Sequence, residues 1–90
     1  MIARVAQRFA WQSLEDEAVI IDLVTRRVMG LNRSGTFLWT RVDGLRTVGE
    51  LAAMLAERFG LPTPHAQADT ASFIGAMAAR GLLVLSAQHP

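Results

Sequence analysis

The side chains that most often catalyse reactions are few in this sequence and stand far apart. His65 follows Pro64 at the start of a predicted helix, and His89 lies in the C-terminal tail. Neither histidine has a carboxylate or a nucleophile at a spacing typical of general acid–base pairs, so we expect both to face solvent. Ser34 lacks the strand-turn-helix setting of a nucleophile elbow. With no glycine-rich phosphate loop either, the pattern predicts a protein that is not an enzyme.

The composition excludes further kinds of chemistry. The 90 residues contain no cysteine, which rules out disulfides, thiolate metal sites and thiol catalysis. The formal net charge is only +1, so the balance of charges does not indicate a nucleic-acid partner. The longest apolar runs, such as 18–21 and 82–85, are too short to span a bilayer, and no secretion signal follows Met1. We expect one soluble cytoplasmic domain over residues 1–90, without metal, cofactor or membrane contact.

The stretch from Arg27 to Trp39 carries the strongest indication of function. An apolar strand over 28–31 ends at Asn32 and runs directly into a helix. This strand is the last of a small predicted sheet, so its outer edge is left uncovered. Proteins either protect such an edge or use it to bind another strand, and we expect it to be used. Gly30 would let a second backbone approach closely, although a bulge at this position is the alternative interpretation.

Two strands are predicted before this one. Apolar residues at Val5, Phe9 and Trp11 alternate with Arg8 and Gln12, which predicts a first strand of about eight residues. The acidic run 15–17 then forms a turn. The segment 18–23 is apolar on both faces, as is typical of a central strand. A tight turn at 25–26 would join it to the strand over 28–31 as an antiparallel hairpin.

Three helices follow the strands. Asn32 is expected to cap the first helix, which runs to about residue 42 with Trp39 as a packing anchor. Thr47 and Glu50 form a capping box at the start of the second, which ends at Gly60. An apolar tail over 82–85 must pack back on the body. The order predicts an α+β, winged helix-turn-helix-like domain, with a three-stranded antiparallel sheet followed by three helices.

The third helix is expected to begin at its cap Thr63, to hold Pro64 in its first turn and to end at Gly81. A helical projection places Ala66, Thr70, Phe73 and Met77 on one stripe of this helix, with Ile74 beside it. At least two of Phe73, Ile74 and Met77 are expected in the core. Small and polar side chains on the flank of that stripe would suit the wall of a groove: Asp69, Ser72, Ala76 and Arg80.

An ordered set of short motifs covers most of the chain from Ala18 to Leu83: Leu31-Asn32, Gly35, Trp39, Asp43-Gly44, Arg46-Thr47-Val48, Glu50-Leu51, Asp69, Phe73-Ile74 and Gly81-Leu82-Leu83. This set resembles the PqqD-like family of peptide chaperones, also called RiPP recognition elements. Members of that family bind the leader segment of a ribosomally made precursor peptide and present it to a modifying enzyme. In the family, the leader adds to the third strand beside the third helix. The family's hairpin turn usually carries Gly or Asn where this chain has Arg26, which leaves a different turn type open.

The resemblance implies a non-catalytic domain that binds a leader peptide by strand addition in the biosynthesis of a RiPP, lasso-peptide or PQQ-type product. The expected partners are the precursor peptide and a separate modifying enzyme, and a homodimer through an edge strand stays open. A proline at Met29 would abolish binding if the Met29 N–H faces outward. The strand and the third helix supply the expected peptide-binding residues: Arg27, Val28, Met29, Gly30, Leu31, Asp69, Ser72, Phe73, Ala76 and Arg80.

A winged-helix transcriptional regulator that binds DNA is the alternative function. The third helix would then be the recognition helix. Between Pro64 and Gly81, however, it offers one arginine, no lysine and one aspartate. A DNA-reading helix is expected to gather basic residues that contact phosphates. The sequence therefore favours a peptide, and we expect no nucleic-acid partner.

Overall fold

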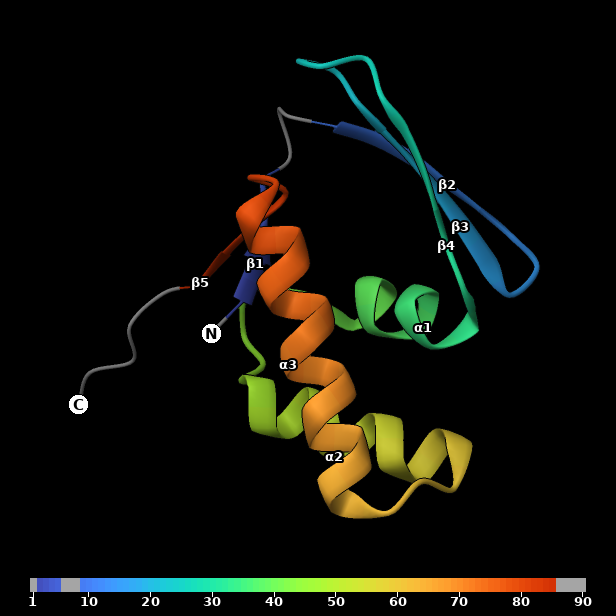
Figure 1. Cartoon of the computed structure of the whole chain (residues 1–90), viewed down its shortest axis with the longest axis vertical. Coiled ribbons are helices and arrows are strands. Elements are labelled where there is room, and N and C mark those ends of the chain that lie inside the picture. Colours follow the sequence, from blue (N-terminus) through green and yellow to red (C-terminus); the bar gives the residue numbers. More distant parts are fainter. Residues whose placement is uncertain (1, 6–8, 86–90) are drawn as a thin grey trace.

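The computed structural model describes residues 2–5 and 9–85. A three-stranded sheet stands at one end of the molecule and the helices at the other, with a second, two-stranded sheet beside α3 (Figure 1). The elements follow in the order β1 (Ile2–Arg4), β2 (Phe9–Leu14), β3 (Glu17–Asp22), β4 (Val28–Leu31), α1 (Arg33–Arg41), α2 (Val48–Phe59), α3 (Thr63–Ala79) and β5 (Leu83–Leu85). The predicted α+β architecture is confirmed, and the pairing of β1 with β5 adds to it.

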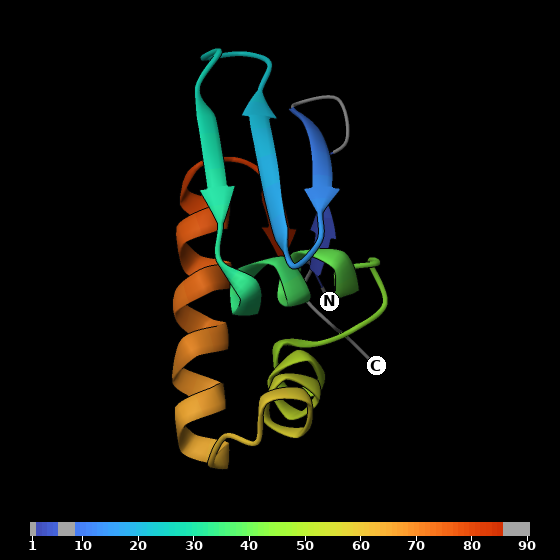
Figure 2. The same cartoon turned by 90° about the vertical axis from the view of Figure 1, so that its right-hand side faces the viewer.

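The three-stranded sheet has the order β2-β3-β4, and both pairings are antiparallel. The prediction that the segment around 18–23 is the central strand is confirmed. Its neighbour β4 is paired on one side only and forms an edge of the sheet, on the side where α3 lies (Figure 2). Within β3, the Ile20 side chain is fully buried on one face of the sheet, whereas the Ile21 side chain on the opposite face is 41% exposed. The helices therefore cover one face of the sheet.

The predicted first strand of about eight residues is wrong. Only the part from Phe9 onward belongs to β2, which pairs with β3, whereas β1 ends at Arg4 and pairs with β5. Val5 follows β1 and its N–H donates to the Leu82 carbonyl at 3.0 Å. Arg8 lies outside the described residues. The apolar tail does pack back on the body, and it does so as a strand, with Leu85 opposite Ile2.

The hairpin turn between β3 and β4 is wider than the predicted turn at 25–26. Its closing hydrogen bond runs from the Asp22 N–H to the Arg27 carbonyl at 2.9 Å. The Asp22 carboxylate accepts the N–H groups of Val24 and Thr25 within the turn. Arg26 takes the left-handed conformation, with φ of 61°. The arginine thus adopts the backbone that glycine or asparagine favours, at a cost of about 1–2 kcal/mol.

The helix boundaries follow their local signals, with one exception. The Asn32 side chain caps α1, Thr47 and Glu50 form the predicted capping box of α2, and Gly60 ends α2 with φ of 65°. The prediction that Thr63 caps α3 is wrong. Thr63 is already helical, and the cap is Pro62, which makes no side-chain hydrogen bond. The Pro62 carbonyl accepts the Ala66 N–H at 3.0 Å, so the helix begins one residue early.

The core lies where the three helices, β1, β5 and the inner face of the three-stranded sheet meet. Trp39 has no exposed surface, and its ring packs edge-on against Phe9 and Trp11 at centroid distances of 5.0 and 6.1 Å. It is thus the packing anchor that the sequence predicts. On α3 the buried stripe consists of Ala66, Thr70, Ile74 and Met77. The expectation that at least two of Phe73, Ile74 and Met77 lie in the core is confirmed, and Phe73 itself is half-buried.

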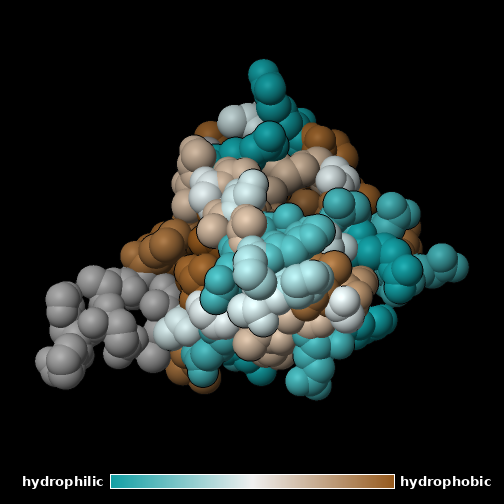
Figure 3. Space-filling model, turned by 60° about the horizontal axis from the view of Figure 1, so that its bottom comes forward, coloured by the Kyte–Doolittle hydropathy of each residue, from teal (hydrophilic) through white to brown (hydrophobic). Residues whose placement is uncertain are grey.

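Seen from its helical end, the molecule presents a largely hydrophilic or intermediate surface, with hydrophobic patches toward the margins (Figure 3). No helix within residues 2–5 and 9–85 is long and apolar enough to cross a membrane.

Candidate functional site

The outer edge of β4 is open. Within the described part of the chain, no strand pairs with β4 on the side away from β3. Among the described residues, no hydrogen bond from outside the β3–β4 ladder reaches the backbone of Val28 or Gly30 there. A Cβ atom added to Gly30 would meet nothing within 4 Å, so the outer face of the sheet is also open at this point. The outer edge of β4 therefore has backbone groups that can bind another strand.

The hydrogen bonds at both ends of the β3–β4 ladder fix which backbone groups face outward. At the turn, the Asp22 N–H donates to the Arg27 carbonyl. Facing pairs in an antiparallel ladder alternate between hydrogen-bonded and non-hydrogen-bonded. Met29, opposite Ile20, therefore directs its N–H and C=O toward β3. The intervening residues direct theirs away from the sheet.

The outward-facing residues are Val28 and Gly30, each with one N–H and one C=O. Met29 supplies a donor within the sheet, so its N–H does not face outward as the proline test assumed. A proline at Met29 would test the sheet and not its edge. Val28 is 68% exposed, and it shares the outer face of the sheet with Gly30.

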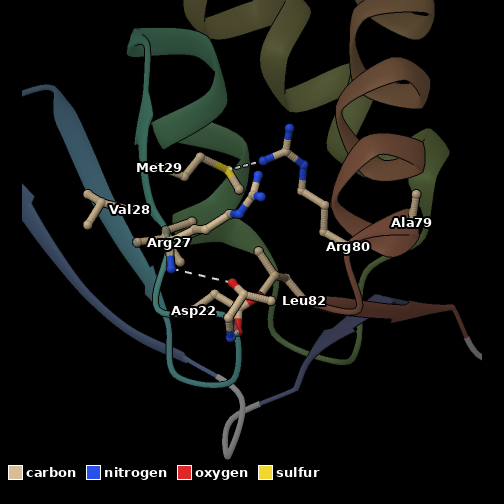
Figure 4. A pocket seen from close by; sticks show the side chains of 9 residues that line it. Asp22, Arg27, Val28, Met29, Ala79, Arg80 and Leu82 are labelled. Carbon is tan, nitrogen blue, oxygen red and sulfur yellow. Dashed lines mark hydrogen bonds between the residues drawn. The ribbon is translucent and has the colours of Figure 1, made fainter.

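Two hollows of the described structure border α3, an upper one beside β4 and a lower one beside the start of α1. The upper hollow, of about 540 Å³, joins the β3–β4 hairpin to the C-terminal end of α3 and is lined by Ile20, Asp22, Thr25, Arg27, Val28, Met29, Ala79, Arg80 and Leu82. Ile20 and Leu82 are fully buried and give it an apolar floor. Figure 4 shows Arg80 reaching from the end of α3 toward β4, where its Nη1 donates to the Met29 sulfur at 3.7 Å.

The lower hollow, of about 280 Å³, lies where α1 begins beside the middle of α3. Its lining residues are Asn32, Ser34, Gly35, Leu38, Asp69, Ser72 and Phe73. The Asn32 amide oxygen accepts the Gly35 N–H at 2.8 Å and thereby caps α1. A Cβ atom added to Gly35 would lie 3.4 Å from the Phe73 ring. That is an ordinary van der Waals contact, whereas the same Cβ would lie only 3.1 Å from the Asn32 amide oxygen, so the glycine leaves room for the cap.

The two hollows differ in charge. Arg27 and Arg80 line the upper hollow, and neither makes an ion pair with any residue that the structure describes. Asp69 lines the lower hollow and lies 3.0 Å from His65 Nε2. The expectation that His65 has no carboxylate at a useful spacing is therefore wrong, because residues four apart face each other on a helix.

Most of the predicted site residues line these hollows. Arg27, Val28, Met29 and Arg80 lie in the upper one, and Asp69, Ser72 and Phe73 in the lower one. Gly30 is at the open edge. Leu31 is instead 7% exposed and packs in the core, and Ala76 lines neither hollow.

Sequence reasoning missed several lining residues, chiefly Ala79, Leu82, Asn32, Ser34 and Leu38. The sequence predicts Asn32 as the cap of α1. Its place beside β4 follows as well, because β4 ends at the residue before it. Ala79 directly precedes Arg80, so a groove wall extended by one residue would have included it. Within residues 2–5 and 9–85, no cluster of three or more histidine or acidic side chains is arranged to hold a metal ion.

Comparison with known proteins gives two kinds of match. A family model described as coenzyme PQQ synthesis protein D (PqqD) matches residues 17–83. No curated protein sequence matches the chain. The fold is similar to that of TbiB1, solved in complex with the TbiA(beta) leader peptide, with a TM-score of 0.81, 21% identity, and coverage of 94% of this chain and 99% of that one.

A second solved structure, a lasso peptide synthetase B1 complexed with the leader peptide, is also similar. Its TM-score is 0.75 and its identity 14%, with coverage of 87% of this chain and 92% of the other. At these identities the two structures establish a shared fold. The arrangement of strands and helices is thus one that other proteins also adopt.

Proposed function

Because the chain belongs to the PqqD family, we propose that it binds the leader segment of a ribosomally made precursor peptide. The leader adds as a strand to the outer edge of β4 and lies in the groove beside α3. The chain then presents the bound precursor to a separate modifying enzyme in the cytoplasm. Two structures of similar fold were solved with leader peptides, which supports the proposal.

The open edge of β4 is the observation that carries this proposal. Val28 and Gly30 offer two N–H and two C=O groups to an incoming backbone, and Gly30 adds no side chain that would obstruct it. Extended peptides bind to other proteins in this way, with main-chain hydrogen bonds for affinity and pockets for alternate side chains. The edge of β4 has both parts, because the upper hollow lies beside it and the lower hollow lies just past its end, where Asn32 follows β4.

The magnitudes indicate that the hollows must contribute to affinity. Four ladder hydrogen bonds at about 0.5–1.5 kcal/mol net each supply less than most estimates of the cost of association, about 4–15 kcal/mol. Side chains of an added strand alternate between the two faces of the sheet. Every second residue of the leader would therefore point toward α3, where apolar and polar contacts select the sequence.

We further propose that the chain itself performs no chemistry on the peptide. Among the described residues, the polar side chains of the upper hollow are two arginines, the Thr25 hydroxyl and the Asp22 carboxylate, and the Asp22 carboxylate accepts N–H groups of the hairpin turn. His65 is exposed and contacts Asp69 on the surface of α3. These groups suit recognition of a peptide. The reaction would belong to the modifying enzyme that receives the bound precursor.

A matched pair of substitutions at Gly30 tests the proposal. Gly30→Pro removes an outward N–H, whereas Gly30→Ala keeps the N–H and adds a Cβ to open space. The probe is a display library of random peptides, selected against the wild-type chain. We expect selected peptides to bind Gly30→Ala about as well as the wild type and to lose most of their affinity for Gly30→Pro. Circular dichroism and thermal unfolding verify that both variants fold.

Equal affinity for the two folded variants would show that the edge of β4 is not the binding site. Failure to select any peptide would also count against the proposal. Duplex DNA serves as the competing ligand. Salt-sensitive binding of DNA, without peptide binding, would favour the transcriptional regulator instead.

A further inference from the structure

Two arginines from different elements converge on the upper hollow. Arg27 precedes β4, and Arg80 follows the last turn of α3. Both side chains line the same hollow and point into the space beside Met29 (Figure 4). Both arginines are exposed to solvent, so a negatively charged ligand can reach both guanidinium groups. Such a ligand would be attracted by the two positive charges together.

The hydrogen-bonding capacity of Arg80 is largely unused. A guanidinium has five N–H donors, and thioether sulfur is a weak acceptor. The contact of Arg80 with the Met29 sulfur holds the guanidinium over the groove at 3.7 Å without satisfying it. The donors that remain can bind a carboxylate in the bidentate geometry that arginine favours.

One acidic side chain of the described residues, Asp22, also lines the upper hollow. Its carboxylate oxygen Oδ1 accepts the N–H of Val24 at 2.9 Å and that of Thr25 at 3.2 Å. These contacts hold Asp22 in the hairpin turn. No ion pair joins it to Arg27 or Arg80. The positive charge of the hollow therefore faces the groove.

We infer that the peptide bound along β4 carries an aspartate or glutamate whose carboxylate lies between Arg27 and Arg80. The inference rests on the proposed function, and it names the peptide side chain that the upper hollow selects. The acidic residue occupies a position of the added strand that faces α3, next to Met29. Asp69 lies about three turns earlier on α3 and would repel the same side chain from the lower hollow. The charges of the two hollows thus set the register of the peptide.

The test uses peptides selected from a random display library against the wild-type chain. We expect one position of the selected sequences to be enriched in aspartate or glutamate. Replacing that residue by its amide should weaken binding about tenfold, which corresponds to about 1.4 kcal/mol. Arg27→Gln and Arg80→Gln should each weaken binding of the acidic peptide and leave the amide peptide nearly unchanged. Arg58→Gln is the matched control, because Arg58 lies over Phe59 on α2 and lines neither hollow.

Three results would overturn the inference. Selected peptides that lack an enriched acidic position would do so, and so would equal affinities of the acidic and amide peptides. If Arg58→Gln weakened binding of the acidic peptide as much as Arg80→Gln does, the loss would come from the lower net charge of the protein and not from the upper hollow. In all three cases, loss of binding in Gly30→Pro would leave the proposed function standing. If no peptide binds at the edge of β4, the proposed function fails and the inference fails with it.

Discussion

The Thr36 hydroxyl on α1 takes the place of a strand partner for Ala18. The Ala18 N–H donates to Thr36 Oγ1 at 2.8 Å, and the same hydroxyl donates to the Leu31 carbonyl at 3.3 Å. The hydroxyl therefore bridges β3 and β4 at the end of their ladder, and both Ala18 and Thr36 are buried. The bridge joins α1 to the sheet where the open edge ends.

Loss of this bridge should destabilise the protein. Thr36→Val leaves the buried Ala18 N–H and one acceptor unsatisfied, at a cost of about 1–3 kcal/mol in the free energy of unfolding. Thr36→Ser keeps the hydroxyl and should cost less. Urea denaturation of the three proteins measures the difference. Equal stability of the valine and serine variants would show that the bridge contributes nothing.

The ladder predicts a pattern of amide exchange along β4. In the free protein, the Met29 N–H should exchange slowly, because it donates within the sheet, whereas the N–H groups of Val28 and Gly30 should exchange fast. A selected peptide should slow the exchange of Val28 and Gly30 and change Met29 little. Hydrogen exchange measured by NMR gives all three rates in one experiment. Protection of Val28 and Gly30 without peptide would mean that their edge is already paired.

Two glycine-to-alanine substitutions should differ in their effects on stability. Gly75→Ala on α3 adds a Cβ to open space and should stabilise the helix by about 0.5–1 kcal/mol. Gly35→Ala gains the same helix propensity, but its Cβ would lie 3.1 Å from the Asn32 oxygen that caps α1. Because the cap holds that oxygen in place, we expect Gly35→Ala to be less stable than Gly75→Ala.

Thermal unfolding measures both glycine variants against the wild type. A gain in stability for Gly35→Ala as large as that for Gly75→Ala would mean that the Asn32 side chain shifts at no cost. The cap of α1 would then not depend on a glycine at position 35.

The turn after α1 predicts a dependence of stability on pH. The N–H of Leu45 donates to the Asp43 carboxylate at 2.9 Å, and this hydrogen bond is the main cause that lowers the pKa of Asp43 below its usual value of 3.8. Arg46 acts in the same direction. A carboxyl whose pKa is lowered in the folded state contributes stability that is fully present above its unfolded pKa. That stability is lost as the pH falls through the folded pKa.

Asp43→Asn should therefore reduce the loss of stability on acidification below about pH 4. Urea denaturation at a series of pH values compares the variant with the wild type. The difference between the two proteins should be constant from pH 5 to 7, about one unit or more above the usual pKa of an aspartate, and should shrink at lower pH. A difference independent of pH would refute the assignment.

Local signals made much of this fold predictable. Asn32 marks the end of β4, the pair Thr47 and Glu50 starts α2, and Gly60 ends it, because each acts through its nearest neighbours. The first predicted strand began too early, because β2 starts only at Phe9. Val5 instead follows β1, which pairs with β5 at the other end of the chain. Alternation along 5–12 continues without a break, so no pattern within that segment reveals where β2 begins.

The site could be predicted as a strand and a helix face, but not atom by atom. The register with β3 decides which N–H groups of β4 face outward. A slip of one residue would turn the outward N–H groups inward and the inward ones outward. The hairpin turn fixes that register, and Arg26 reaches its left-handed conformation there despite an unfavourable side chain. The convergence of Arg27 and Arg80 requires the packing of α3 against the sheet, which no local motif contains.

The pairing of β1 with β5 also bears on how the protein can be handled. Because Ile2 lies opposite Leu85, the first and last strands are neighbours, and Figure 1 shows them across α3 from β4. An affinity tag or a surface tether joined beyond either strand would extend from the same region of the molecule. Immobilised by either terminus, the protein should keep the groove accessible to ligands in solution.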